Sequence, residues 1–141
     1  MAPRDPKLER LHSIPLFAGL GGRELGRLGQ LADRVDLPAG HVLMREGQNG
    51  SEMFIFAAGG ALVERDGREI ARCGPGDVVG EIALLSEGPR TATVTLTEPS
   101  TLFVLAHREF HTLMDDLPAV RMAVLDELAR RLRVLELDRA H

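Results

Sequence analysis

Residues 80–94 read Gly-Glu-Ile-Ala-Leu-Leu-Ser-Glu-Gly-Pro-Arg-Thr-Ala-Thr-Val, which sets one arginine nine residues after a Gly-Glu pair. A helical turn that starts near Gly80 leaves its first backbone N–H groups without intrahelical partners, and glycine lets an anion approach the backbone closely. The guanidinium of Arg90 is always charged and offers a planar fork that matches phosphate oxygens. Glu81 only accepts hydrogen bonds, so it suits a sugar hydroxyl. The stretch therefore predicts a binding site for a phosphodiester beside a sugar.

The same stretch resembles the phosphate-binding cassette of the cyclic nucleotide-binding domain family. The family pattern is Gly-Glu-hydrophobe-Ala-Leu, a variable stretch, and then Pro-Arg-small-Ala-Thr/Ser-Val, and residues 80–94 fill every one of these positions. The alternative is that Gly80 is a simple bend and that Glu81 and Arg90 are solvated surface charges. The ordered run favours the cassette, and the resemblance covers residues 16 to 133. Further matching segments, in the family's order, are 38–40, 45–47, 53–55, Gly59 and 74–77.

The resemblance implies how a ligand is held. Arg90 and the N–H groups near Ala83 and Thr91 hold the cyclic phosphate, Glu81 with the Gly80 backbone holds the ribose hydroxyl, and the final helix covers the base. Arg130, Arg131 and Arg133 are candidates for a contact with the base, with Arg131 preferred by its position, although all three also suit a solvated helix face. The candidate ligand-binding residues are Gly80, Glu81, Ile82, Ala83, Arg90, Thr91, Ala92 and Arg131.

Length and composition exclude several classes of protein. A chain of 141 residues predicts one domain over residues 1–141, and the net charge of -4 disfavours DNA binding, which needs clustered cations. Apolar runs fall short of the ~20 residues that span a bilayer, so membrane insertion is not expected. The N-terminus lacks a secretory pattern, and the single Cys73 cannot form an internal disulfide. These features predict a cytoplasmic protein.

The apolar pattern predicts a mainly β fold with flanking helices. Residues 8–32 form an N-terminal helical part, residues 33–106 a jelly roll that contains the cassette at 80–92, and residues 107–139 the C-terminal helices. Asp66-Gly67 is a strong hairpin signal, and Ala92, Val94 and Leu96 share one face of a strand with threonines on the other. Patterning alone leaves a small barrel open, and the resemblance selects the double-stranded β-helix (jelly roll). The candidate strands are 35–37, 41–44, 53–56, 61–65, 69–73, 78–79, 92–97 and 101–106.

The last helix carries a narrow apolar stripe and charged pairs. Asp126 with Arg130 and Glu127 with Arg131 are acid-then-base pairs four residues apart. The stripe suits packing on the roll or pairing with another helix, including a homodimer. It consists of Val120, Val124, Leu128, Leu132 and Leu135.

Catalytic chemistry is not indicated. The five histidines are scattered except for His107 and His111, which share a helical face and are interpreted as surface or capping residues, and no strand has the paired histidines of a jelly-roll metal site. Cys73 is interpreted as a buried small apolar residue, and Ser86 is not in a nucleophile elbow. We therefore expect no catalytic residues, no metal and no cofactor.

The predicted function is a regulatory domain that binds cAMP, or less favourably cGMP, without transforming it and signals by movement of its C-terminal helix. Thr91 leaves the choice of ligand open, because its hydroxyl suits a guanine amino group. An attached or associated effector domain is expected, and the chain is interpreted as part of a larger protein. The alternatives are a jelly roll without a ligand that serves interaction or dimerisation, and a small metal-dependent dioxygenase.

Overall fold

The computed structural model describes residues 6–139, and the chain divides into two compact units. One unit contains the chain up to Gly29 together with the chain from Thr112 onward, and the other is Gln30–His111. N-terminal helices, antiparallel strands and a long C-terminal helix are all present, so the predicted fold class is confirmed. The assignment of residues 1–141 to a single domain stays a prediction.

The first unit is helical. The N-terminal part of the chain packs on itself closely at Gly29, where an added Cβ would lie 2.4 Å from Cδ2 of Leu8. The Lys7 Nζ donates to the Gly29 carbonyl at 2.6 Å. In the same unit, a Cβ added to Gly19 would lie 3.6 Å from the Cβ of Ala123, so these two residues are neighbours. The helices are α1 (Pro6–His12), the 3-10 turn η1 (Pro15–Phe17), α2 (Gly22–Leu31), α3 (His107–Asp116) and α4 (Pro118–Arg139), of which α2 and α3 cross the boundary between the units.

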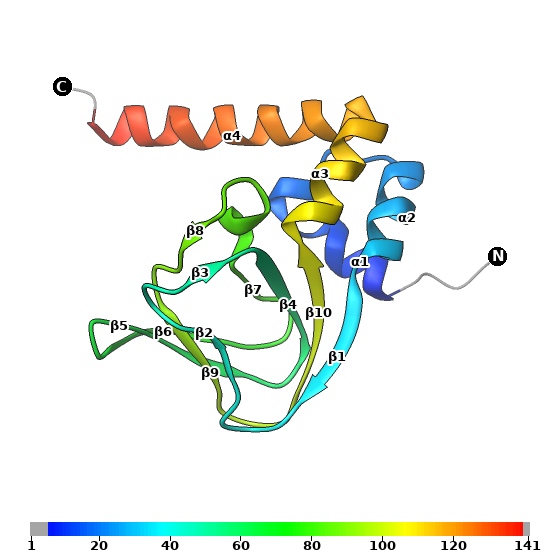
Figure 1. Cartoon of the computed structure of the whole chain (residues 1–141). Helices are drawn as coiled ribbons and strands as arrows, with labels where there is room; N and C mark the ends of the chain where they lie inside the picture. The colour runs from blue at the N-terminus through cyan, green and yellow to red at the C-terminus, as the bar shows by residue number, and fades with distance from the viewer. Residues whose placement is uncertain (1–5, 140–141) are drawn as a thin grey trace. The chain divides into compact units, whose positions relative to one another are not determined.

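The second unit is a roll of antiparallel strands (Figure 1). One sheet has the order β1 (Asp33–Leu37), β10 (Ser100–Ala106), β4 (Glu52–Ala58), β7 (Val78–Val79). The other has the order β2 (Val42–Met44), β9 (Thr93–Leu96), β5 (Ala61–Arg65), β6 (Arg68–Cys73). Each of the eight predicted strands is present, and their bounds differ from the prediction by one or two residues at most.

The core of the roll lies between the two sheets, because alternate side chains of each strand point inward. Ala92, Val94 and Leu96 are buried, whereas Thr91 and Thr97 are exposed, which confirms the predicted faces of this segment. The buried core consists of Met44, Phe54, Phe56, Ala61, Val63, Ala92, Val94, Leu96 and Leu102.

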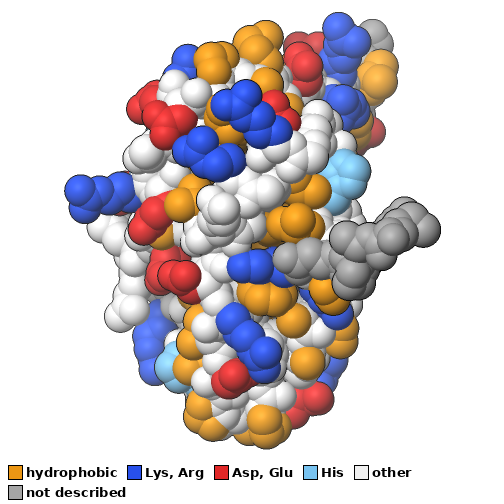
Figure 2. Space-filling model, turned by 90° about the vertical axis from the view of Figure 1, so that its right-hand side faces the viewer, with side chains coloured by type: hydrophobic (Ala, Val, Ile, Leu, Met, Phe, Trp, Pro, Cys, Tyr) orange, Lys and Arg blue, Asp and Glu red, His pale blue; other side chains and the backbone are white. Residues whose placement is uncertain are grey.

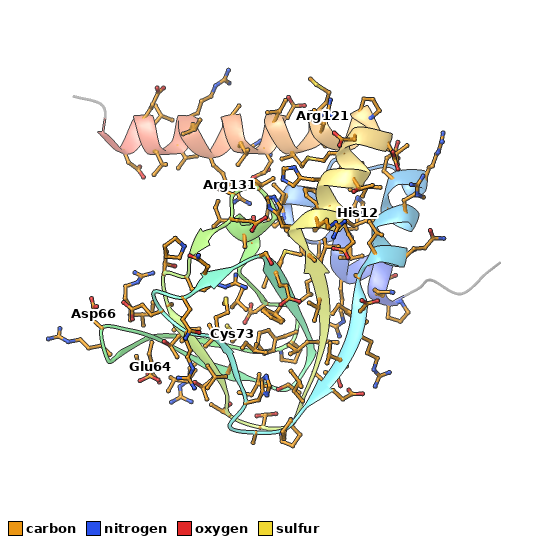
Figure 3. The ribbon with its side chains drawn as sticks, viewed as in Figure 1. His12, Glu64, Asp66, Cys73, Arg121 and Arg131 are labelled. Carbon is orange, nitrogen blue, oxygen red and sulfur yellow. The ribbon has the colours of Figure 1, made fainter. Side chains whose placement is uncertain are left out.

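Asp66 and Gly67 connect β5 to β6, as predicted. Their φ angles are +53° and +75°, the left-handed pair that a tight hairpin turn requires. Figure 3 shows Asp66 at the tip of this hairpin. Cys73, at the end of β6, packs at the edge of the core, and the residue that was interpreted as buried is only half-buried.

A third, very small sheet was not predicted. It pairs β3 (Asn49–Gly50) with β8 (Gly88–Pro89), so that Asn49 lies opposite Pro89 and Gly50 opposite Gly88. These residues are typical of turns, and two-residue strands leave no alternating pattern to detect. The pair ties the segment before β4 to the end of the cassette.

Basic and acidic side chains are mixed on the face drawn in Figure 2. Within residues 6–139, no helix has both the length and the apolar character needed to cross a lipid bilayer.

Candidate functional site

The second unit contains a cavity of about 470 Å³ beside the cassette. This volume lies in the range of small-molecule sites, which are mostly apolar with a few polar groups that orient the ligand. Strands β5, β6, β7 and β9 and the turn after β7 all contribute to its walls. The lining residues are Met44, Val63, Arg65, Ile70, Val79, Gly80, Ile82, Ala83, Ser86, Glu87, Gly88, Pro89, Arg90, Thr91, Ala92 and Val94.

Six of the eight predicted ligand-binding residues line this cavity, namely Gly80, Ile82, Ala83, Arg90, Thr91 and Ala92. Glu81 is half-buried at the start of the 3-10 turn η2 (Glu81–Leu84) and is not among the lining residues. Arg131 belongs to the first unit, where Figure 3 shows it on α4, and its contact with a base stays a prediction.

Gly80 is the N-cap residue of η2, and its conformation favours glycine. Its φ of +78° is left-handed, and an added Cβ would lie 2.6 Å from the Glu52 carbonyl oxygen. The Gly80 carbonyl accepts a hydrogen bond from the Ala83 N–H at 3.0 Å. The Ala83 N–H closes the first turn of η2, and the expected phosphate contact of N–H groups near Ala83 stays a prediction. The turn is a 3-10 turn, so the third residue after Gly80 already has a partner.

The Arg90 guanidinium lies in a slot between two glycines. A Cβ added to Gly50 would lie 1.8 Å from Nε and 2.2 Å from Cζ of Arg90, and one added to Gly80 would lie 2.8 Å from Nη1. Each glycine therefore leaves the space that the guanidinium fills. The guanidinium faces the large cavity on one side, and on the other it contributes to a smaller polar cavity of about 200 Å³.

Burial lowers the pKa of Arg90 from its ordinary value, and the nearby Glu52 carboxylate opposes this effect. Arginine keeps its proton in proteins, so the group stays a cation in a partly desolvated position. A partly buried cation is costly unless an anion or hydrogen-bond acceptors compensate it, so the slot favours a negatively charged ligand group.

The backbone of Arg90 is held from the segment before β3. The Arg90 N–H donates to the Gln48 carbonyl and the Gly47 N–H donates to the Arg90 carbonyl, both at 2.8 Å. Together with the β3–β8 pair, these bonds fix the Cα of Arg90 relative to Gly50. Sequence reasoning missed Gly50, and the signal that could have found it was the Gly-Gln-Asn-Gly run at 47–50, which was interpreted only as a turn.

Much of the rest of the cavity wall is apolar. Met44, Val63, Val79 and Val94 form the inner surface, and sequence analysis placed all four in strands without assigning them to the site. Ile70 and Ile82 also line the cavity and are 48% and 59% exposed, so apolar surface remains open to a ligand.

Arg65 supplies a second cation at the edge of the cavity. Its Nε donates to the Thr91 carbonyl at 2.9 Å, so β5 holds the residue that follows Arg90. This arrangement leaves the Thr91 side chain exposed at the cavity wall.

Arg131 and its neighbour Arg130 on α4 both contact the carboxylate of Glu127. This contact restricts the Arg131 side chain. Glu127 is buried on α4 and accepts from both Arg130 and Arg131, with 3.4 Å between Arg131 Nε and a Glu127 oxygen. The predicted Glu127–Arg131 pair is confirmed. Arg130 was predicted to pair with Asp126, but it pairs with Glu127 at spacing three instead.

Within residues 6–139, no three His, Cys, Asp or Glu side chains lie close enough to hold a metal ion. Burial raises the pKa of the Cys73 thiol, and the Asp77 carboxylate adds to this rise. The thiol is therefore a poor nucleophile, because the reactive form is the thiolate.

Comparison with known proteins identifies the class. The cyclic nucleotide-binding domain family matches residues 34–116, which is more than half of the chain, and the chain belongs to this family. It is similar to members named as cAMP receptor proteins. The Cyclic AMP receptor protein of Thermus thermophilus is 32% identical over 129 residues, which cover 88% of this chain and 60% of that protein.

Solved structures agree with this assignment. The N-terminal domain of a transcriptional regulator from Streptomyces coelicolor superimposes with a TM-score of 0.87 and 33% identity, covering 94% of this chain and 96% of that one. The regulatory domain of Toxoplasma gondii PKA, solved with cAMP, gives a TM-score of 0.67 and 31% identity over 79% of this chain and 46% of that one. The chain spans about three fifths of the length of the first curated relatives that it matches.

Proposed function

We propose that this domain is a sensor that binds cAMP, and less tightly cGMP, in the 470 Å³ cavity without transforming it. The main observation behind the proposal is the Arg90 guanidinium in its slot between Gly50 and Gly80, at the wall of a mostly apolar cavity. The comparisons add support, since relatives are named for cAMP and one is solved with it.

The charge of the site fits a cyclic phosphate. A cyclic phosphodiester carries one negative charge, and a single guanidinium with a planar donor fork matches it. A nucleoside triphosphate would require more cations and usually a metal ion. The cavity offers Arg90 and Arg65 as cations, and Arg65 is already bonded to the Thr91 backbone.

The sugar and base then occupy the rest of the cavity. Glu81 is proposed to accept from the ribose hydroxyl after a small movement of η2, because in this structure it lies outside the lining. The base packs against Ile82 and Ile70, whose exposed apolar surface it would bury. Thr91 is the residue proposed to discriminate adenine from guanine, since its hydroxyl can donate and accept.

Calorimetric titration with cAMP and with cGMP tests the proposal. The expected result is saturable binding of cAMP that Arg90→Ala weakens by about 30-fold or more, the usual cost of removing one partner of a partly buried charge pair. Arg72→Ala is the matched control, because Arg72 is 67% exposed and pairs with Glu69 outside the cavity. Absence of binding by either nucleotide, or equal binding by the two arginine variants, would overturn the proposal.

Signalling is proposed to run through α4, whose folding over the base would report occupancy to an attached or associated effector domain. The residues of the apolar stripe of α4 differ in their exposure to solvent. Val120 and Val124 are buried, whereas Leu132 and Leu135 are 62% and 54% exposed. This exposed half is the segment that an effector or a ligand would cover.

The same exposed half favours a second candidate function, dimerisation through α4. Met122, Leu125, Val134 and Leu137 are also exposed, so apolar side chains lie on more than one face of the helix. Sedimentation of the wild-type protein and of Leu132→Glu tests this second candidate. A dimer that the substitution dissociates supports pairing through α4, and a monomer at all concentrations contradicts it.

A further inference from the structure

His107 makes three polar contacts from the junction of β10 and α3. Its backbone N–H donates to the Ser51 carbonyl at 2.7 Å. Its ring Nδ1 lies 2.8 Å from the Ala83 carbonyl oxygen, and its Nε2 lies 3.5 Å from a carboxylate oxygen of Glu87. All four residues belong to the second unit. The first residue of α3 therefore contacts the cassette at two points.

The ring is held in one orientation. A carbonyl oxygen can only accept, so Nδ1 carries a hydrogen and donates to Ala83 whether the imidazole is neutral or protonated. The His107 side chain is only 19% exposed, and its ring stacks on that of His111 with 4.0 Å between centroids. Packing and hydrogen bonding thus both restrict the rotamer of His107.

The two carbonyls that His107 contacts belong to the two walls of the Arg90 slot. Ser51 directly follows Gly50, and Ala83 lies in η2, which Gly80 directly precedes. One residue therefore ties together the segments whose glycines flank the guanidinium. A change in the distance between these walls would widen or close the slot.

We infer that His107 is a positioning residue, which fixes the width of the Arg90 slot by holding Ser51 and Ala83 and links the cassette to the first turn of α3. The inference rests on the proposed function, since the slot is the proposed seat of the cyclic phosphate. Ligand affinity depends on this link through preorganisation, because a slot that is already formed spares the ligand the cost of ordering it.

Two substitutions of equal polarity separate the side-chain bond from general packing. In His107→Asn the amide nitrogen reaches the position of Nδ1 and keeps the bond to Ala83. In His107→Gln the amide reaches the position of Nε2, so it keeps only the approach to Glu87. His107→Ala removes both, and His41→Ala is the control because His41 is an exposed histidine of the same unit, outside the cavity lining.

The test is calorimetric titration of cAMP into each variant, with thermal unfolding recorded to confirm that each is folded. His107→Ala and His107→Gln are expected to weaken binding by about fivefold to tenfold, the effect of one lost hydrogen bond, while His107→Asn and His41→Ala stay within about twofold of wild type. Equal affinity in all variants, or equal losses in His107→Asn and His107→Gln, would overturn the inference.

Amide hydrogen exchange of the ligand-free protein gives a second readout. Exchange of the amides of residues 80–91 should be faster in His107→Ala and His107→Gln than in wild type, and unchanged in His41→Ala. If wild type binds cAMP but neither readout responds to His107, the inference fails and the proposed function stands. If wild type binds neither cAMP nor cGMP, the proposed function fails, and the inference fails with it.

Discussion

The substitution Gly50→Ala tests the Arg90 slot without touching a charged group. The new Cβ would lie 1.8 Å from Nε, 2.2 Å from Cζ and 2.6 Å from Nη2 of Arg90, closer than any real contact. The obstructed atoms belong to the end of a flexible side chain, and the Gly50 backbone is not in the left-handed region. The guanidinium is therefore expected to move out while the backbone stays in place.

The expected effect on affinity follows from the contact that is lost. A hydrogen bond to a charged group contributes roughly 1.5–3 kcal/mol, so displacing the guanidinium should raise the dissociation constant for cAMP about 10-fold to 150-fold. Folding should be nearly unaffected, since the half-buried guanidinium can rotate toward solvent while the backbone stays in place. Gly50→Ala thus separates binding from stability, which a substitution in the core would not do.

The assay is calorimetric titration of cAMP together with thermal unfolding of the same samples. Gly74→Ala is the control, because a Cβ there meets no atom within 4 Å. A double-mutant cycle completes the experiment: in the Arg90→Ala background, Gly50→Ala should have almost no further effect on affinity. The reasoning is refuted if Gly50→Ala binds cAMP as tightly as Gly74→Ala, or if its loss persists undiminished in the absence of Arg90.

The remaining predictions concern stability and reactivity. Gly80→Ala should lower the free energy of unfolding by about 1–3 kcal/mol in urea titrations, because φ is +78° and the new Cβ would lie 2.6 Å from the Glu52 carbonyl; an unchanged midpoint would contradict this. The hydrogen bond from Thr101 Oγ1 at 2.6 Å is the main cause that lowers the pKa of Asp36 below 3.8. Because this pKa is lowered on folding, its stabilising effect is present above pH 3.8 and is lost as pH falls through the folded value, and Thr101→Val should raise the pKa of Asp36 in NMR titrations. Burial raises the pKa of Cys73, so the thiol should react with iodoacetamide more slowly at pH 8 than a free cysteine does, and an equal rate would count against the burial.

Much of the fold could be predicted because its signals are local. The alternation of Ala92, Val94 and Leu96 with threonines fixed which face of β9 is buried, and Asp66-Gly67 located a hairpin from two residues. Such patterns follow from the period of a strand and the φ angles of a tight turn, so one segment carries them alone.

The parts that could not be predicted depend on contacts between distant segments. Gly50 matters because Arg90, forty residues later in the chain, fills the space beside it. His107 matters because its ring reaches Ala83, and sequence analysis interpreted it as a surface or capping residue. The sequence also does not reveal whether the turn after Gly80 closes with spacing three or four, so it could not show that the Ala83 N–H already has a partner.

The central claim is that the Arg90 guanidinium, held between Gly50 and Gly80, seats a cyclic phosphate. A crystal structure of this domain grown with cAMP tests it most directly. The account predicts a phosphate oxygen within hydrogen-bond distance of the Arg90 guanidinium, with the base against the Ile70 and Ile82 wall of the same cavity. A nucleotide bound elsewhere, or a phosphate without contact to Arg90, would contradict it.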